Sequence, residues 1–140
     1  MKKILVAVDG SEPALKGVRM AALLAKATGA RLVLAYVSPP NLLPPHVYAE
    51  VIRELEAQER KYGQQILNTA RAEAASSGVE CDEVVAVGAA AEVIADLADD
   101  GAVDLVVVGS KGKGAVSRVM LGSVADRLVH VCKKPVLVAR

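Results

Sequence analysis

Large aromatic rings are almost missing from this sequence. Its 140 residues include no Trp, no Phe and three Tyr. Proteins that bind single-stranded nucleic acid use such rings as stacking platforms, so the composition argues against that class. Apolar residues nevertheless make up 53% of the chain, which is too many for a disordered tail. The core must therefore be built from Val, Leu, Ile and Ala.

Excess charge, paired cysteines and long apolar runs are missing as well. Seventeen basic residues balance sixteen acidic ones, so no basic surface indicates a nucleic-acid or membrane partner. The two cysteines, Cys81 and Cys132, lie far apart, which favours a reducing, cytoplasmic setting. No run approaches the roughly 18 apolar residues of a membrane span. His46 and His130 lack metal-ligand spacing, and we expect no metal site made by the protein alone.

Apolar strand-like runs alternate with helical patterns along the whole chain. The predicted strands are Ile4 to Val8, Arg31 to Val37, Val84 to Val87, Leu105 to Val108 and Val136 to Ala139. Helices are predicted between them, from the N-cap Ser11 to the stop at Gly29, over about Val47 to Ser76, over Ala90 to Ala98 and over Ser123 to Val131. This alternation predicts an α/β fold in which one domain, residues 1–140, has a parallel sheet with helices on both faces.

Ligands of open parallel sheets bind beyond the carboxyl ends of the strands, where the strand order reverses. The loops after Val8, Val37 and Val108 are therefore the candidate ligand loops. The third of these is glycine-rich: Gly109-Ser110-Lys111-Gly112, nine further residues, then Gly122-Ser123. Glycines without a Cβ can adopt positive φ and approach an anion closely, and successive N–H groups then form a nest for phosphate oxygens.

The helix after this loop adds to the attraction for an anion. Ser123 is predicted to be its N-cap, where the helix dipole and the unpaired N–H groups favour negative charge. Lys111, Lys113 and Arg118 add positive charge around the loop. The segment alone is explained equally well as a surface connection with turn glycines and a capping serine. Its place after the most apolar strand favours a binding role.

Several other nucleotide and phosphate sites are disfavoured by the sequence. The loop has no Gly-Lys-Ser/Thr ending of a P-loop, and Asp9-Gly10-Ser11-Glu12 lacks the spaced glycines of a dinucleotide fingerprint. A phosphate-accepting receiver domain needs an aspartate at the end of the third strand, where Val87 and Gly88 stand. A nucleotidyl transferase needs a His-rich motif, and a flavin site needs aromatic neighbours.

The pattern G-x2-G-x9-G-S resembles that of the ATP-binding universal stress proteins. The resemblance extends over the whole chain, through Lys2 to Ser11, Leu32 to Val37, Val103 to Ser110, Leu121 to Ala125 and Lys134 to Val138. It implies an open five-stranded sheet of order 3-2-1-4-5, a fold similar to the adenine nucleotide alpha hydrolases. Two positions depart from the family. Tyr36 replaces a frequent histidine, and Ala90 replaces a proline, which we expect to loosen a helix start without affecting the nucleotide.

The resemblance also implies which residues would bind the nucleotide. Asp9 would meet the ribose or the metal region, and Ala7 and Val37 would flank the adenine. The ribose and phosphates would be held by Gly109, Gly112, Gly122, Ser123 and Val124, with Val108, Ser110 and Lys111 completing the set. ATP is the implied ligand, with ADP and AMP left open, and Mg²⁺ would be held mainly by the phosphates, near Asp9.

The resemblance thus implies a nucleotide-dependent stress-response or signalling module, and we assign no catalytic residues. The alternative is a slow or partner-activated ATPase. Because Val136 to Ala139 should form an apolar sheet edge, we also expect a homodimer through this last strand, as the resemblance implies. The identity of any further protein partner is left open.

Overall fold

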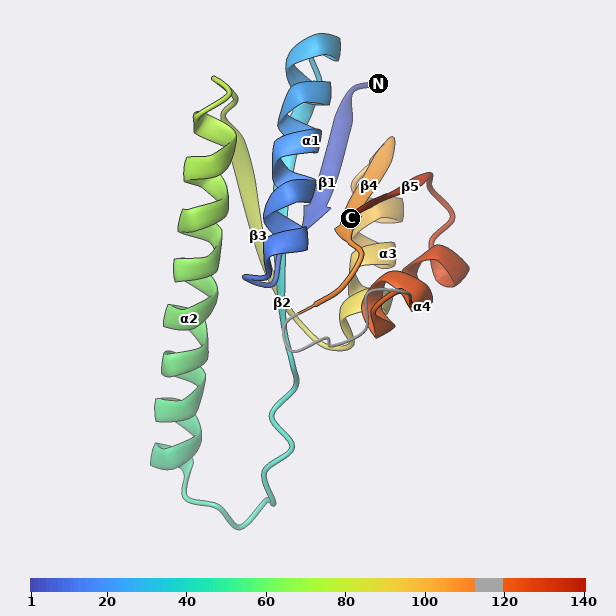
Figure 1. The fold of residues 1–140 in the computed structure, drawn as a ribbon. Coiled ribbons are helices and arrows are strands. Elements are labelled where there is room, and N and C mark those ends of the chain that lie inside the picture. Colours follow the sequence, from blue (N-terminus) through green and yellow to red (C-terminus); the bar gives the residue numbers. More distant parts are fainter. Residues whose placement is uncertain (113–119) are drawn as a thin grey trace.

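Five parallel strands and four helices alternate along the chain, of which the computed structural model describes residues 1–112 and 120–140 (Figure 1). The strands are β1 (Lys3–Ala7), β2 (Arg31–Ser38), β3 (Cys81–Val87), β4 (Leu105–Gly109) and β5 (Val136–Ala139). The helices are α1 (Glu12–Thr28), α2 (Ala49–Ala75), α3 (Ala90–Asp100) and α4 (Ser123–Val131). The sheet order is β3-β2-β1-β4-β5, which confirms the predicted fold and strand order.

The helices form two layers that cover opposite faces of the sheet (Figure 1). Alternate residues of β1 point to opposite sides: Ile4 and Val6 pack in the cluster with α1 and α2, whereas Leu5 packs in the cluster with α3 and α4. The interior strand β4, between β1 and β5, is buried along its whole length. Aliphatic side chains and alanines fill both layers, as the shortage of aromatic residues requires.

Local signals in the sequence set the ends of α1. The Ser11 hydroxyl accepts a hydrogen bond from the Ala14 N–H at 3.3 Å, as the predicted N-cap should. Gly29 ends the helix with φ 75° and donates its N–H to the Ala25 carbonyl. Residues 8–11 alone connect the end of β1 to the start of α1.

Strand β3 is longer than the apolar pattern predicted. It begins at Cys81 and pairs with β2 through the acidic residues Asp82 and Glu83. Because β3 is at the edge of the sheet, these side chains reach solvent and form ion pairs with Arg31 and Arg71. Charged residues are common on such edges, where they discourage pairing with other chains.

Two features of the fold bear on the candidate site. The strand order reverses between β1 and β4, so the loops that follow these strands meet at one edge of the sheet. The N-terminal half of α2 extends past that edge, beside the segment that follows β2 (Figure 1).

Within the described residues, no helix combines the length and the apolar character needed to cross a membrane.

Candidate functional site

A cleft of about 70 Å³ lies at the carboxyl ends of β1, β2 and β4, on the face covered by α3 and α4. Eight of the eleven residues predicted to bind nucleotide line it: Ala7, Asp9, Val37, Val108, Gly109, Lys111, Gly112 and Val124. These residues come from four separate parts of the sequence. The topology therefore brings together the positions that the resemblance selected.

The other three predicted residues lie beside the cleft. Ser110 is buried, and its carbonyl accepts a hydrogen bond from the Gly122 N–H at 2.7 Å. That bond joins the start of the glycine-rich loop to its end and sets where α4 begins. Ser123 is exposed as the first residue of α4.

Hydrogen bonds tie the loop after β1 to the loop after β4. The Asp9 carboxylate accepts from the Ser11 N–H at 2.9 Å through Oδ1. The Ser11 hydroxyl in turn donates to the Lys111 carbonyl at 3.3 Å. Asp9 thus has the role of a turn former, and its other oxygen, Oδ2, lies toward Gly112 in the cleft. The two loops form one connected wall.

The described glycines of the loop allow close approach and do not adopt positive φ, which corrects that part of the sequence prediction. Gly109, Gly112 and Gly122 are absent from the residues with positive φ. A Cβ on Gly109 would lie 2.7 Å from the Ala14 nitrogen, so this glycine lets β4 pack against the start of α1. A Cβ on Gly112 would lie 3.0 Å from Asp9 Oδ2 in the cleft, and one on Gly122 would lie 3.0 Å from the Lys111 Cα.

The predicted N-cap Ser123 is also corrected. Gly122 is the N-cap of α4, with φ −64° and ψ 159°, and it has no side chain to cap the helix. Ser123 is the first helical residue, and no side-chain hydrogen bond caps the helix. The first N–H groups of α4 therefore have no capping side chain within the described residues, and they lie beside the cleft, which Val124 and Ala125 line.

One carboxylate and one ammonium group stand among the residues that line the cleft, those of Asp9 and Lys111. The partial positive charge at the amino end of α4 adds to that of Lys111. Lys113 and Arg118, which the sequence placed around the loop, lie outside the described residues. Residues 1–112 and 120–140 contain no group of three His, Cys, Asp or Glu side chains that could hold a metal ion.

Seven residues of the cleft were missed by the sequence analysis: Val8, Ser11, Ala14, Ala35, Ala90, Ile94 and Ala125. Ser11 had been assigned a capping role alone. Ala90 lines the cleft as well as beginning α3, so the expectation that its replacement of proline concerns only the helix start is too narrow. Position 90 shapes the cleft wall directly.

Tyr36, the other departure from the family pattern, faces away from the cleft. It packs in the layer of α1 and α2, and its hydroxyl donates to the Glu59 carboxylate. Burial, together with this neighbouring carboxylate, raises the pKa of Tyr36 above its usual range. The residues before and after it in β2, Ala35 and Val37, line the cleft instead. The change from histidine therefore leaves the cleft lining unaltered.

The whole chain matches a known family. The model of the universal stress protein family covers residues 1–140. A universal stress protein of Bacillus subtilis, YxiE, is 33% identical over 145 residues, which span 99% of this chain and 98% of the relative.

Solved structures agree with this match. The universal stress protein UspA from Lactobacillus plantarum superposes with a TM-score of 0.87 at 26% identity, covering 99% of this chain and 97% of that one. A universal stress protein from Archaeoglobus fulgidus, solved in complex with dAMP, superposes with a TM-score of 0.72 at 26% identity. That superposition covers 100% of this chain and 98% of the other.

Proposed function

The chain belongs to the universal stress protein family, and on this premise we propose that it binds an adenine nucleotide, ATP or its products, in the cleft between β1 and β4. The observation that carries the proposal is the convergence of eight separately predicted residues on one cleft. A relative of similar fold was solved with dAMP, which supports an adenine nucleotide as the ligand.

The chemistry of the cleft suits the parts of a nucleotide. Ala7 and Val37 are small apolar walls at the ends of β1 and β2, and they would flank the adenine ring. Asp9 Oδ2 is available to accept from a ribose hydroxyl, because Oδ1 already holds the Ser11 N–H. The ribose therefore belongs near the loop after β1.

The phosphates belong at the opposite end of the cleft, at the glycine-rich loop. Gly112 lines the cleft without a side chain, and Gly122 lets the end of the loop pack closely against the backbone of Lys111. The N–H groups at the start of α4, which no side chain of the described residues caps, and the Lys111 ammonium supply attraction for an anion. Gly109, Ser110 and Ser123 support this loop, and Val108 and Val124 close its apolar side. Among the described residues, the cleft offers one carboxylate, so Mg²⁺ would be held mainly by the phosphates.

We propose a binding module, acting in stress response or signalling, in preference to an enzyme with rapid turnover. Fast hydrolysis requires a group that orients the attacking water. Asp9 is the one titratable acid among the described lining residues, and its second oxygen is assigned to the ribose, which leaves no lining carboxylate to orient the water. A slow or partner-activated ATPase is the alternative. Phosphate release from saturating Mg-ATP, at a rate far below a typical enzyme's ~10 s⁻¹, separates the two.

The proposal includes a homodimer through β5. This strand is at an edge of the sheet, and three of its four residues, Val136, Leu137 and Val138, are only half-buried. An apolar edge of this kind is a template for pairing with a second copy. Both cysteines are free thiols, which suits a reducing compartment such as the cytoplasm.

A nucleotide carried through purification tests the ligand directly. The protein is denatured after gel filtration, and the released small molecules are separated by chromatography. We expect AMP, ADP or ATP in a ratio approaching one per chain from the wild type and much less from a folded Gly112→Val variant. Release of a nucleotide from both proteins in equal amounts would place it elsewhere.

A further inference from the structure

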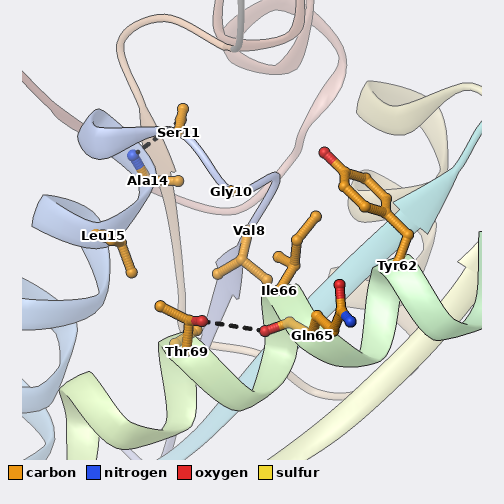
Figure 2. A pocket seen from close by; sticks show the side chains of 10 residues that line it. Val8, Gly10, Ser11, Ala14, Leu15, Tyr62, Gln65, Ile66 and Thr69 are labelled. Atoms are coloured by element: carbon orange, nitrogen blue, oxygen red, sulfur yellow. Dashed lines mark hydrogen bonds between the residues drawn. The ribbon is translucent and has the colours of Figure 1, made fainter.

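A second cavity lies on the other face of the sheet, between α1 and α2 beyond the end of β1 (Figure 2). Its volume is about 190 Å³, larger than that of the nucleotide cleft. It is lined by Val8, Gly10, Ser11, Ala14, Leu15, Tyr62, Gln65, Ile66, Thr69 and Ala70. Val8, Ser11 and Ala14 also line the cleft, so the two sites share one wall.

The walls and polar groups of this cavity define the chemistry of an occupant. Val8, Leu15 and Ile66 form an apolar floor, whereas Gln65 and Thr69 stand at the rim on successive turns of α2 (Figure 2). The Gln65 side chain offers both a donor and an acceptor. The Thr69 hydroxyl donates to the Gln65 carbonyl at 3.1 Å, so it can accept from a ligand. An occupant needs an apolar body and a polar substituent at one end.

None of the ten lining residues carries a charge. The rim at Gln65 and Thr69 is exposed to solvent, but an ion on the apolar floor would still lose part of its hydration without gaining a charged partner among these residues. A neutral molecule loses much less. The cavity therefore selects for an uncharged ligand, in contrast to the nucleotide cleft with its lysine and helix terminus.

Size limits the ligand further. A dry apolar cavity of about 150 Å³ accommodates benzene. A cavity of about 190 Å³ has room for one ring with a small substituent. We propose that this cavity is a second ligand site, which takes an uncharged single-ring molecule whose hydrogen-bonding substituent meets Gln65 and Thr69.

Titration of the nucleotide-free, full-length protein with benzamide tests the site by amide NMR. A ligand of this size is expected to bind with a dissociation constant on the order of 1 mM. Saturable shifts should appear at the amides of Leu15, Gln65 and Thr69. Benzoate and benzamidine have the same shape but carry opposite charges, and both should bind at least about tenfold more weakly.

Two variants with the same new side chain locate the binding. Thr69→Phe fills the rim and should abolish the benzamide shifts, whereas Asn68→Phe, one residue away and outside the lining, should leave them unchanged. If Thr69→Phe fails to fold, Gln65→Leu keeps the volume, removes the amide and should weaken binding several-fold.

Three results would overturn the proposal. They are no saturation at ~10 mM benzamide, equal affinity for benzoate, and shifts confined to α3 and α4, which would place the probe in the nucleotide cleft. Because the protein is nucleotide-free and the readout lies on α1 and α2, failure here leaves the proposed nucleotide binding untouched. Failure of nucleotide binding would likewise not contradict the proposal of this second site.

Discussion

A Cβ atom on Gly112 would lie 3.0 Å from Oδ2 of Asp9. The loops after β4 and β1 thus approach each other across the cleft, with room between them only because residue 112 has no side chain. The nearby atom is the far end of a flexible carboxylate, which can move aside by a few tenths of an ångström. A larger residue at position 112 therefore occupies the cleft without breaking the fold.

This geometry predicts that Gly112→Val folds normally but loses nucleotide. We expect the melting temperature to stay within about 4 °C of the wild type. Adenine nucleotide affinity should fall by about 100-fold or more, which is roughly 2.7 kcal/mol of binding free energy. Calorimetric titration and thermal unfolding of the same preparations measure both quantities. Unchanged affinity in a folded Gly112→Val protein would contradict the site.

Gly122→Val is the less selective variant. Its Cβ would lie 3.0 Å from the Lys111 Cα and 3.3 Å from both the Gly112 nitrogen and the Ser110 carbonyl oxygen. All three are backbone atoms, which cannot move aside without shifting the loop. Loss of binding in this variant could therefore come either from a blocked phosphate site or from a shifted loop. Gly112→Val tests the blocked site alone.

Helix α2 contains a glycine that the core requires. A Cβ on Gly63 would lie 2.5 Å from both Cδ1 and Cε1 of the buried Tyr36 ring. Gly63→Ala should therefore lower the free energy of unfolding by about 1–3 kcal/mol. An exposed helical Gly→Ala change normally raises it by about 1 kcal/mol. Urea unfolding of both proteins measures the sign of the change in the free energy of unfolding.

A second substitution tests the cause of that loss. In a Tyr36→Leu background the ring is gone, so Gly63→Ala should cost at least about 1 kcal/mol less than in the wild type. An equal cost in both backgrounds would show that the clash with the ring is not responsible.

Apolar alternation and turn residues predicted most of the fold, because both are local. Ser11 and Gly29 set the ends of α1, and the boundaries of α4 and β5 agree with prediction. The start of β3 was missed because Asp82 and Glu83 can be tolerated only at a solvated edge, and edge position is a property of the whole sheet.

The site was predicted less completely, for a related reason. Small residues such as Ala35 and Ala90 give the same sequence pattern whether they pack under a helix or line a cleft. Only the tertiary arrangement decides between these environments. The same holds for Gly109, whose need for a missing Cβ comes from α1, nearly a hundred residues earlier in the sequence. The family pattern identified the position but not that reason.

Acid should weaken the hydrogen bonds of Asp104, which lies at the end of the sheet opposite the nucleotide cleft. The Asp104 carboxylate accepts from the Lys2 and Lys3 N–H groups at 2.6 and 3.0 Å, which lowers the pKa of Asp104 below the ordinary 3.8. Its stabilising contribution is present above about pH 3.8 and is lost as the pH falls through the lower folded-state pKa.

Asp104→Asn should therefore melt below the wild type at pH 7, and the difference should shrink as the pH falls below about 4. Asp99→Asn is the control, because it removes the same negative charge at an exposed position of α3. It should have little effect on the melting temperature. A difference for Asp104→Asn that grows in acid would refute this assignment.

The dimer prediction is testable at Val138. The carbonyl of Pro135 accepts a hydrogen bond from Val106 in β4, and that of Ala139 accepts one from Ser110, just after β4. Because backbone direction alternates along a strand, Val138 turns its N–H to the open edge. Val138→Pro removes that donor while keeping the bonds to β4, so it should shift the protein from dimer to monomer in analytical ultracentrifugation.

Val138→Thr keeps the N–H and is the matched control, which should remain a dimer. A wild-type monomer at micromolar concentration, or a dimer that persists in a folded Val138→Pro variant, would be incompatible with pairing through β5.

Calorimetric titration of nucleotide-free protein with AMP and ATP, with and without Mg²⁺, tests the central claim most directly. The account predicts saturable binding of one adenine nucleotide per chain, strengthened by Mg²⁺ for ATP and removed by Gly112→Val. A folded wild-type protein that gives no binding heat and no amide shifts in the cleft at millimolar nucleotide would contradict it.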